Sequence, residues 1–135
     1  MAYWLLKSEP SDYSYADLEK DGRARWDGVR NAVALKNMRR VSEGDQAFFY
    51  HTGSERAIVG IVDIESDPYP DPEADDEKIV VFDISPGRKL AQPVALSAIK
   101  ESGSFDDWEL VRIPRLSVMP APEATWSAIL DMAER

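Results

Sequence analysis

Apolar residues along this chain gather in short runs separated by Gly, Pro, Asp and Ser, a pattern typical of strands joined by turns. Residues 3–7 and 46–51 form such runs and are predicted to be buried strands. Residues 57–66 begin with apolar side chains on both faces, as in a barrel wall covered by a helix. The loop 52–56 is predicted to join the last two segments as a β-hairpin.

Proline shapes the next part of the strand pattern. The stretch 67–77 is predicted to be an acidic, proline-rich loop. A strand is predicted over residues 78–85, followed by a turn at 86–89. Residues 89–95 are predicted to be an extended segment at a sheet edge, because Pro93 cannot donate a hydrogen bond to a neighbouring strand.

Two short helices are predicted in the N-terminal part from their capping residues. The first begins at Ser14 as N-cap, has Asp17 at the capping-box position and ends at Gly22, which can adopt a left-handed conformation. The second covers residues 32–38, with Asn31 as its candidate N-cap.

The C-terminal part combines helical segments with one extended stretch. A short helix is predicted over 96–102 with Ser97 as a possible cap, and 109–122 is predicted to be extended and broken at Pro114. The last helix, 123–135, carries one apolar stripe formed by Trp126, Ile129, Leu130 and Ala133. The pattern predicts one α+β domain over 1–135: a small mixed barrel, mainly antiparallel, with short flanking helices.

Charge is distributed unevenly along the chain. The net charge of −9 argues against a general polyanion binder, which needs many basic residues on phosphates. The window 20–41 nevertheless holds seven basic and two acidic residues, so the remainder carries −14. A basic patch on an acidic body suits a nucleic-acid contact of small footprint, and an ordinary solvated helix face stays open. The candidate phosphate contacts in this window are Arg23, Arg25, Lys36, Arg39 and Arg40.

The composition excludes several kinds of site. The chain has no cysteine and one histidine, so disulfides, thiolate catalysis and multi-histidine metal sites within one chain are excluded. It shows no EF-hand spacing, and we expect no metal and no cofactor. It has no apolar run long enough to span a bilayer, and its start does not resemble a signal peptide, so we expect no membrane partner. The absence of cysteine fits a cytoplasmic protein, which we expect here.

Four segments in order and spacing give a specific resemblance. They are "YWLLKSEP" (3–10), "WDGVRN" (26–31), "GDQAFFYHT" (44–52) and "RLSVMP" (115–120). With "IVGIV" and "YPD" between them, nearly the whole chain resembles the EVE domain family of the PUA-like superfamily. The resemblance implies a curved pseudo-barrel sheet and a non-catalytic reader of a modified base, in DNA more than in RNA.

The resemblance and the residue types together suggest a base pocket. A base reader needs an aromatic surface for stacking, polar groups for the base edge, and groups that hold the sugar–phosphate. Trp26 is predicted to stack on the base, with Ser8, Asn31 and His51 at its edge and Tyr50 closing one side. The complete set of predicted ligand-binding residues is Lys7, Ser8, Trp26, Val29, Arg30, Asn31, Tyr50, His51, Thr52, Arg115 and Ser117.

Structural interpretations of these residues stay open beside the functional ones. Trp26 can be a core tryptophan, Asn31 a helix cap, and His51 a buried structural histidine. Arg115 can pair with a phosphate or with a core carboxylate. Where the family continues "GVRN" with an aromatic, a glutamine and "A-R-N", this chain has "AVALKN", which either widens the pocket or only repacks the helix.

Two other functions compete with base reading. Lys7, Glu9 and Thr52 suggest a nucleoside amidohydrolase like those of the related ASCH domains, although the recognisable motifs match EVE rather than ASCH. The acidic loop suggests a protein-interaction module. Turnover of a modified nucleoside would favour the first, and a pull-down that is insensitive to nuclease would favour the second. The sequence leaves the oligomeric state open.

Overall fold

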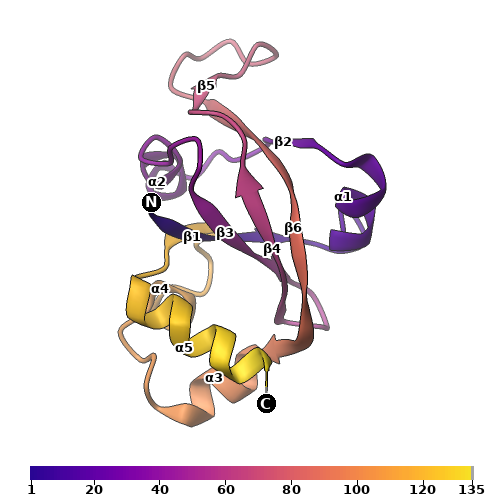
Figure 1. The fold of residues 1–135 in the computed structure, drawn as a ribbon. Helices are drawn as coiled ribbons and strands as arrows, with labels where there is room; N and C mark the ends of the chain where they lie inside the picture. Colours follow the sequence, from indigo (N-terminus) through magenta and orange to yellow (C-terminus); the bar gives the residue numbers. More distant parts are fainter. Residues whose placement is uncertain (135) are drawn as a thin grey trace.

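The computed structural model describes residues 1–134 and is built around one strongly curved sheet (Figure 1). Its strand order is β2-β6-β4-β3-β1-β7, and β5 pairs with β6. Only the β1–β3 pair is parallel among the described strands. The strands are β1 (Tyr3–Ser8), β2 (Ala24–Trp26), β3 (Gln46–His51), β4 (Ala57–Ile64), β5 (Tyr69–Pro70), β6 (Val80–Ala95) and β7 (Val118–Pro120).

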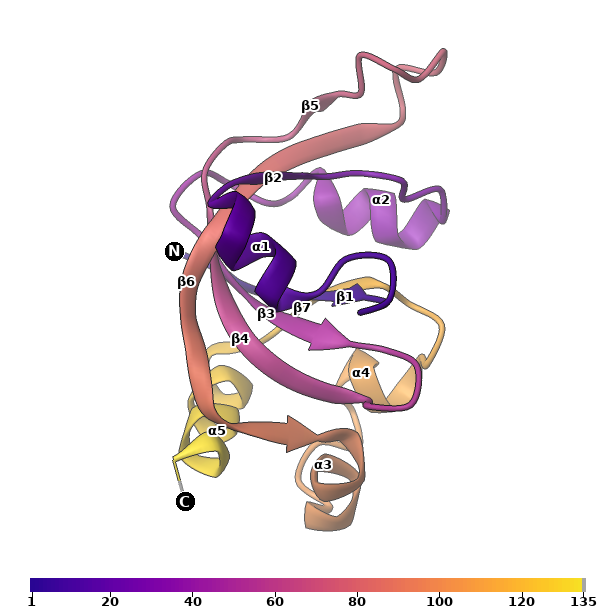
Figure 2. The same cartoon turned by 90° about the vertical axis from the view of Figure 1, so that its right-hand side faces the viewer.

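Five short helices flank the sheet and complete the predicted α+β pseudo-barrel. Figure 2 shows α1 and α2 beside the half of the sheet that holds β2, and α3, α4 and α5 gathered at the other end of β6. None of the described helices is long and apolar enough to cross a membrane. The helices are α1 (Tyr15–Asp21), α2 (Ala32–Met38), α3 (Leu96–Ser102), α4 (Glu109–Arg112) and α5 (Glu123–Ala133).

The capping signals locate the first two helices correctly. The Oγ of Ser14 accepts from the Asp17 backbone N–H, the Asp17 carboxylate accepts from the Ser14 N–H, and Gly22 ends α1 at φ 76°. The side chain of Asn31 accepts from the Ala34 N–H at 3.0 Å and starts α2. These contacts satisfy backbone donors that a helix terminus leaves unpaired.

The predicted turn at 86–89 is wrong, because β6 continues through it. Pairing with β4 shifts register between Pro86 and Arg88, and this irregularity accommodates the Pro86–Gly87 dipeptide without a turn. A Cβ on Gly87 would lie 2.9 Å from the Ile61 carbonyl oxygen, so the close approach of β4 requires glycine. Pro93 lies in an exposed part of β6, as predicted for an edge segment.

Three smaller predictions are also corrected. Ser97 does not cap α3, whose N-cap is Ala95, with no side-chain hydrogen bond. The stretch 109–122 is not simply extended: it forms α4 before Pro114 and β7 after it. The proline-rich loop also contributes the short strand β5.

An aromatic column joins α5 to the sheet. The ring of Trp126 stacks on Phe48 at 3.9 Å and on Tyr3 at 4.3 Å between centroids. Trp4 donates its indole N–H to Asp45 at 2.9 Å, so this buried carboxylate has a partner. These rings pack against the beginning of β1 and the middle of β3, whereas the end of β1 lines the pockets described below.

Candidate nucleic-acid interface

The larger of two adjoining pockets opens beside the end of β1 and has a volume of about 560 Å³. We call it the Trp26 pocket. Its wall comes from the loop after β1, from β2, and from the turn that leads into α2, where Gly28 takes φ 76°. The lining residues are Lys7, Ser8, Glu9, Asp12, Tyr13, Ala24, Arg25, Trp26, Asp27, Gly28, Val29, Arg30, Asn31 and Ser117.

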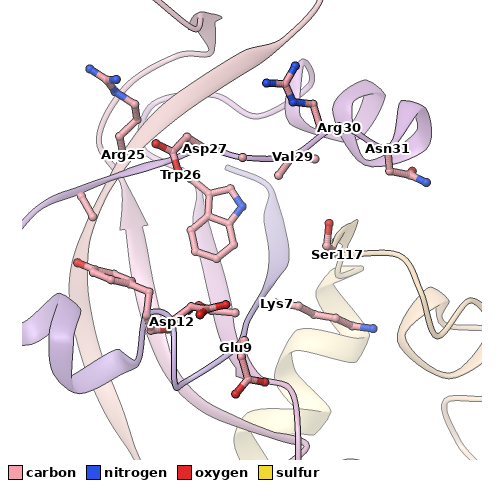
Figure 3. A pocket seen from close by; sticks show the side chains of 14 residues that line it. Lys7, Glu9, Asp12, Arg25, Trp26, Asp27, Val29, Arg30, Asn31 and Ser117 are labelled. Atoms are coloured by element: carbon pink, nitrogen blue, oxygen red, sulfur yellow. Dashed lines mark hydrogen bonds between the residues drawn. The ribbon is translucent and has the colours of Figure 1, made fainter. Parts of the chain in front are cut away.

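Trp26 serves as both core residue and pocket wall. The residue is only 9% exposed, and its ring packs edge to face on Phe49, with 5.9 Å between ring centroids. Figure 3 shows the indole reaching into the centre of the labelled residues, while Arg25 and Arg30 extend outward from the rim. Nε1 of Trp26 is buried and has no hydrogen-bond partner among the described residues. A buried donor without an acceptor lowers the stability of the fold by about 1–3 kcal/mol, and such groups are uncommon in protein cores.

A second aromatic residue in this pocket is missing from the predicted set. Tyr13 lines the pocket and donates its hydroxyl to Asp21 at 2.8 Å. Burial, followed by the contact with Asp21, raises the pKa of Tyr13 to about 12, so the phenol stays neutral. Its only signal in the sequence is its place in the turn after the first strand, and that signal is too general to identify a pocket residue.

The Trp26 pocket carries balanced charge. Three basic side chains (Lys7, Arg25 and Arg30) face three acidic ones (Glu9, Asp12 and Asp27). The hydroxyl of Ser8 donates to the Tyr13 carbonyl, which leaves its oxygen lone pairs as acceptors. The amide oxygen of Asn31 is used in capping α2, which leaves its NH₂ group as a donor at the rim.

Glu9 is held in one position by its neighbours. Its Oε1 accepts from the Ser11 hydroxyl at 2.9 Å and the Ser11 backbone N–H at 3.3 Å, and its Oε2 accepts from the Thr52 hydroxyl at 3.0 Å. The Ser11 contacts and then the Thr52 contact lower the pKa of Glu9. A Cβ on Gly53 would lie 2.7 Å from Oε2, so glycine makes room for this carboxylate.

The smaller pocket, of about 400 Å³, shares Lys7, Glu9 and Ser117 with the first. We call it the Arg115 pocket. Lys7 extends between the two, donates from Nζ to the Pro114 carbonyl at 2.7 Å, and lies 5.6 Å from the centre of the Tyr50 ring. Burial lowers the pKa of Lys7. The lining residues are Lys7, Glu9, Tyr50, Thr52, Gly53, Arg56, Leu96, Lys100, Leu110, Pro114, Arg115 and Ser117.

His51 lies outside both pockets. Its side chain is buried, its Nε2 accepts from the Tyr15 backbone N–H at 3.0 Å, and its Nδ1 lies 2.8 Å from Oε1 of Glu55. Because Nε2 accepts, Nδ1 must carry the proton and donate to Glu55. Nε2 is therefore engaged at the start of α1 and Nδ1 in the loop between β3 and β4, which favours the structural interpretation of His51, and its place at the base edge stays a prediction.

The predicted basic window does not form one patch. Arg23 pairs with Asp83 at 3.1 Å, and Arg25 pairs with Glu73 at 3.5 Å. Arg39 donates to the Lys78 carbonyl, and Arg40 lies over the Trp4 ring. Of the five predicted phosphate contacts, only Arg25 lines the Trp26 pocket, and none lines the Arg115 pocket. Lys36 is exposed on α2.

The other predicted ligand-binding residues come together. Each of them except His51 lines one of the two pockets, although their contact with a ligand stays a prediction. The substituted positions after Asn31 lie outside both linings. Leu35 is buried, which favours the packing alternative there, whereas Ala32 and Val33 are exposed on α2. Residues 1–134 contain no group of three or more His, Asp or Glu side chains placed to hold a metal ion.

Comparison with known proteins agrees with this architecture. The profile described as "EVE domain" matches residues 2–132. Mouse thymocyte nuclear protein 1 is 30% identical, over 98% of this chain and 74% of its own length. A solved protein from Rhodopseudomonas palustris is 38% identical with a TM-score of 0.94, over 99% of this chain and 94% of that one. Human THYN1, solved in complex with DNA containing 5-methylcytosine, is 25% identical with a TM-score of 0.91, over 100% and 99% of the two chains.

Proposed function

Because the chain belongs to the EVE domain family, we propose that it is a non-catalytic reader that binds DNA and holds one modified base in the Trp26 pocket. The pocket volume, about 560 Å³, falls within the range of sites that enclose small organic ligands. A base reached in this way leaves the helical stack and is read by stacking and by hydrogen bonds to its edge.

The observation that carries the proposal is Trp26 at the centre of a pocket with polar side chains around it. Phe49 supports the indole from the core, so the ring can present a rigid surface to a base. Ser8 offers acceptor lone pairs and Asn31 offers amide donors at the rim, which suits the mixed edge of a nucleobase. The human relative bound to 5-methylcytosine DNA makes a modified cytosine the first candidate.

The test is a competition between matched oligonucleotides. The purified protein is titrated into labelled DNA that carries one 5-methylcytosine, and unlabelled strands with cytosine, other modified bases or RNA compete for it. We expect a modified DNA strand to compete best, because contacts between the pocket and the modifying group should distinguish it from the plain strand. Equal competition by plain and all modified strands would contradict base reading.

Catalysis is a second candidate because Lys7, Glu9 and Thr52 do meet in the Arg115 pocket. The hydrogen bonds from Ser11 and Thr52 hold the pKa of Glu9 down, whereas a general base works best with a pKa near the working pH. Lys7 donates to a backbone carbonyl. These features favour binding over turnover. Chromatography of modified nucleosides incubated with the protein distinguishes the two, since hydrolysis would produce a new nucleoside.

A further inference from the structure

The Arg115 pocket has the opposite electrostatic character to the rest of the chain. Four basic side chains line it (Lys7, Arg56, Lys100 and Arg115), and Glu9 is its one acidic residue. The whole chain carries −9. We propose that this pocket holds the phosphodiester group next to the base that occupies the Trp26 pocket.

Three of the four cations of this pocket form no ion pair with any described residue and can bind an anion. Within residues 1–134, no ion pair is formed by Arg56, Lys100 or Arg115, whereas Arg23 and Arg25 are both paired with carboxylates. Glu9 forms no ion pair with them within the described residues, and its carboxylate oxygens accept from Ser11 and Thr52 instead. Unpaired cations around a concave surface are the arrangement that phosphate binding requires.

The backbone brings two of these cations to one rim. Arg56 is the last residue of the loop that joins β3 to β4, and its carbonyl accepts from the Leu96 N–H at 2.9 Å, which ties the hairpin to the start of α3. Lys100 lies four residues after Leu96, on the same face of that helix. The hairpin and the helix therefore present Arg56 and Lys100 to the same pocket although they are far apart in sequence.

Arg56 also holds an unfavourable backbone conformation. Its φ of 44° makes it the only non-glycine residue with positive φ in the described part of the chain. A side chain in this region is costly and persists where the surroundings impose it, often at functional sites. An arginine at a position that glycine would fit better is explained if its guanidinium is needed at the rim.

The two pockets are placed to take adjacent parts of one nucleotide chain. Lys7, Glu9 and Ser117 line both, so a ligand can pass from one to the other without leaving the protein surface. In DNA a base and its flanking phosphates are joined through the sugar. The Trp26 pocket would bind the base, and the Arg115 pocket would bind a phosphate beside it.

This inference rests on the proposed function only for the position of the phosphate. The test uses Arg56→Gln/Lys100→Gln and the charge-matched control Arg88→Gln/Lys89→Gln, whose residues line neither pocket. Binding of plain DNA and of DNA with one 5-methylcytosine is measured by fluorescence anisotropy between about 50 and 200 mM salt. Circular dichroism establishes that both variants are folded.

We expect the pocket variant to bind both DNAs more weakly by the same factor. The slope of log affinity against log salt should become shallower by about 0.7–0.9 for each lost phosphate contact. The control variant should keep the wild-type slope. A pocket variant that behaves like the control would overturn the inference, even if the wild type prefers the modified base.

The position of the phosphate is tested with neutral methylphosphonate groups, placed singly on either side of the modified base. At the position that the Arg115 pocket contacts, the neutral group should weaken wild-type binding. It should have little further effect on the pocket variant, which has already lost the contacting charges. If the neutral group weakens binding of the wild type and of the pocket variant by the same factor at both positions, the assignment of the phosphate to this pocket is overturned. If the wild type binds both DNAs equally, base reading fails while the loss in the pocket variant still supports the phosphate site. If the wild type binds no DNA, both proposals fail.

Discussion

The Trp26 pocket and the Arg115 pocket meet at Lys7 but are built in opposite ways. The first is aromatic, has balanced charge, and is formed mostly by residues 7–31. The second is cationic and gathers residues from β1, the β3–β4 hairpin, α3 and the segment before β7. Their difference suggests a division of labour, in which one pocket selects the base and the other supplies affinity that is independent of sequence.

Replacement of Trp26 should have the largest effect. Trp26→Ala should lower the free energy of unfolding by about 3–5 kcal/mol, because the indole is buried against Phe49. It should also weaken DNA binding by about 1–3 kcal/mol through lost stacking. Both are measured below the melting temperature, by denaturant unfolding and by anisotropy.

Trp108→Ala is the matched control, because Trp108 is also buried but lies outside both pockets. It should cost similar stability and leave DNA affinity unchanged. An equal loss of affinity in the two variants would mean that Trp26 affects binding only through folding. The Trp26 pocket would then have no demonstrated role in stacking on a base.

His51→Ala should affect stability and not base preference. The substitution leaves the Tyr15 N–H without its acceptor, which costs about 1–3 kcal/mol in a buried site. His51→Gln should recover part of this loss, since its amide oxygen can accept the same hydrogen bond. The melting temperature and the ratio of affinities for modified and plain DNA are measured together. A changed ratio at unchanged stability would restore His51 to the base edge.

Lys7 should make DNA binding sensitive to alkaline pH. Burial lowers its pKa, so its positive charge is lost at lower pH than that of an ordinary lysine, and affinity should fall as the pH rises through this range. The loss should be up to about tenfold, or 1.4 kcal/mol. Burial raises the pKa of Tyr50 beside it, so the phenol stays neutral in this range.

Lys7→Arg provides the control for this pH dependence. Arginine stays charged throughout, so the variant should bind DNA with a flatter pH profile. Glu9 and the cations Arg56, Lys100 and Arg115 line the same pocket and are unchanged in the variant. Identical profiles for wild type and variant would show that Lys7 does not contact the phosphate.

Arg56→Gly should have the smallest effect on stability and should separate stability from binding. Glycine accepts a φ of 44° without strain but adds freedom to the unfolded chain, so the free energy of unfolding should change by between 0 and about +1 kcal/mol. DNA affinity should nevertheless fall, because the guanidinium is lost. Affinity and chemical denaturation are measured together, and unchanged affinity would show that Arg56 does not contribute to DNA binding in the Arg115 pocket.

The parts of the fold that were predictable from sequence have local signals. The N-caps of α1 and α2 lie three residues from the backbone N–H groups they satisfy. The turn expected at 86–89 failed because Pro–Gly is a local turn signal, whereas pairing of β6 with β4 decides the conformation there. At that position strand pairing outweighs the turn propensity of Pro–Gly.

The same distinction separates the two pockets. The segment from Trp26 to Asn31 is contiguous, so a pocket wall could be proposed from it directly. Arg56 and Lys100 stand alone in the sequence and meet only through the contact between the hairpin and α3. The local density of charge instead pointed to the window 20–41, where arginines are largely occupied by carboxylates, a carbonyl and an aromatic ring.

The parallel pairing of β1 with β3 has a consequence for the order of folding. Ser8 faces His51 across this pair, and the hydrogen bond from Thr52 to Glu9 spans 43 residues of chain. Closing so long a loop is entropically costly, and topologies of high contact order fold slowly. Both pockets therefore form only when distant strands have docked. A folding intermediate that contains α1 and α2 alone would hold the Trp26 segment without a competent binding site.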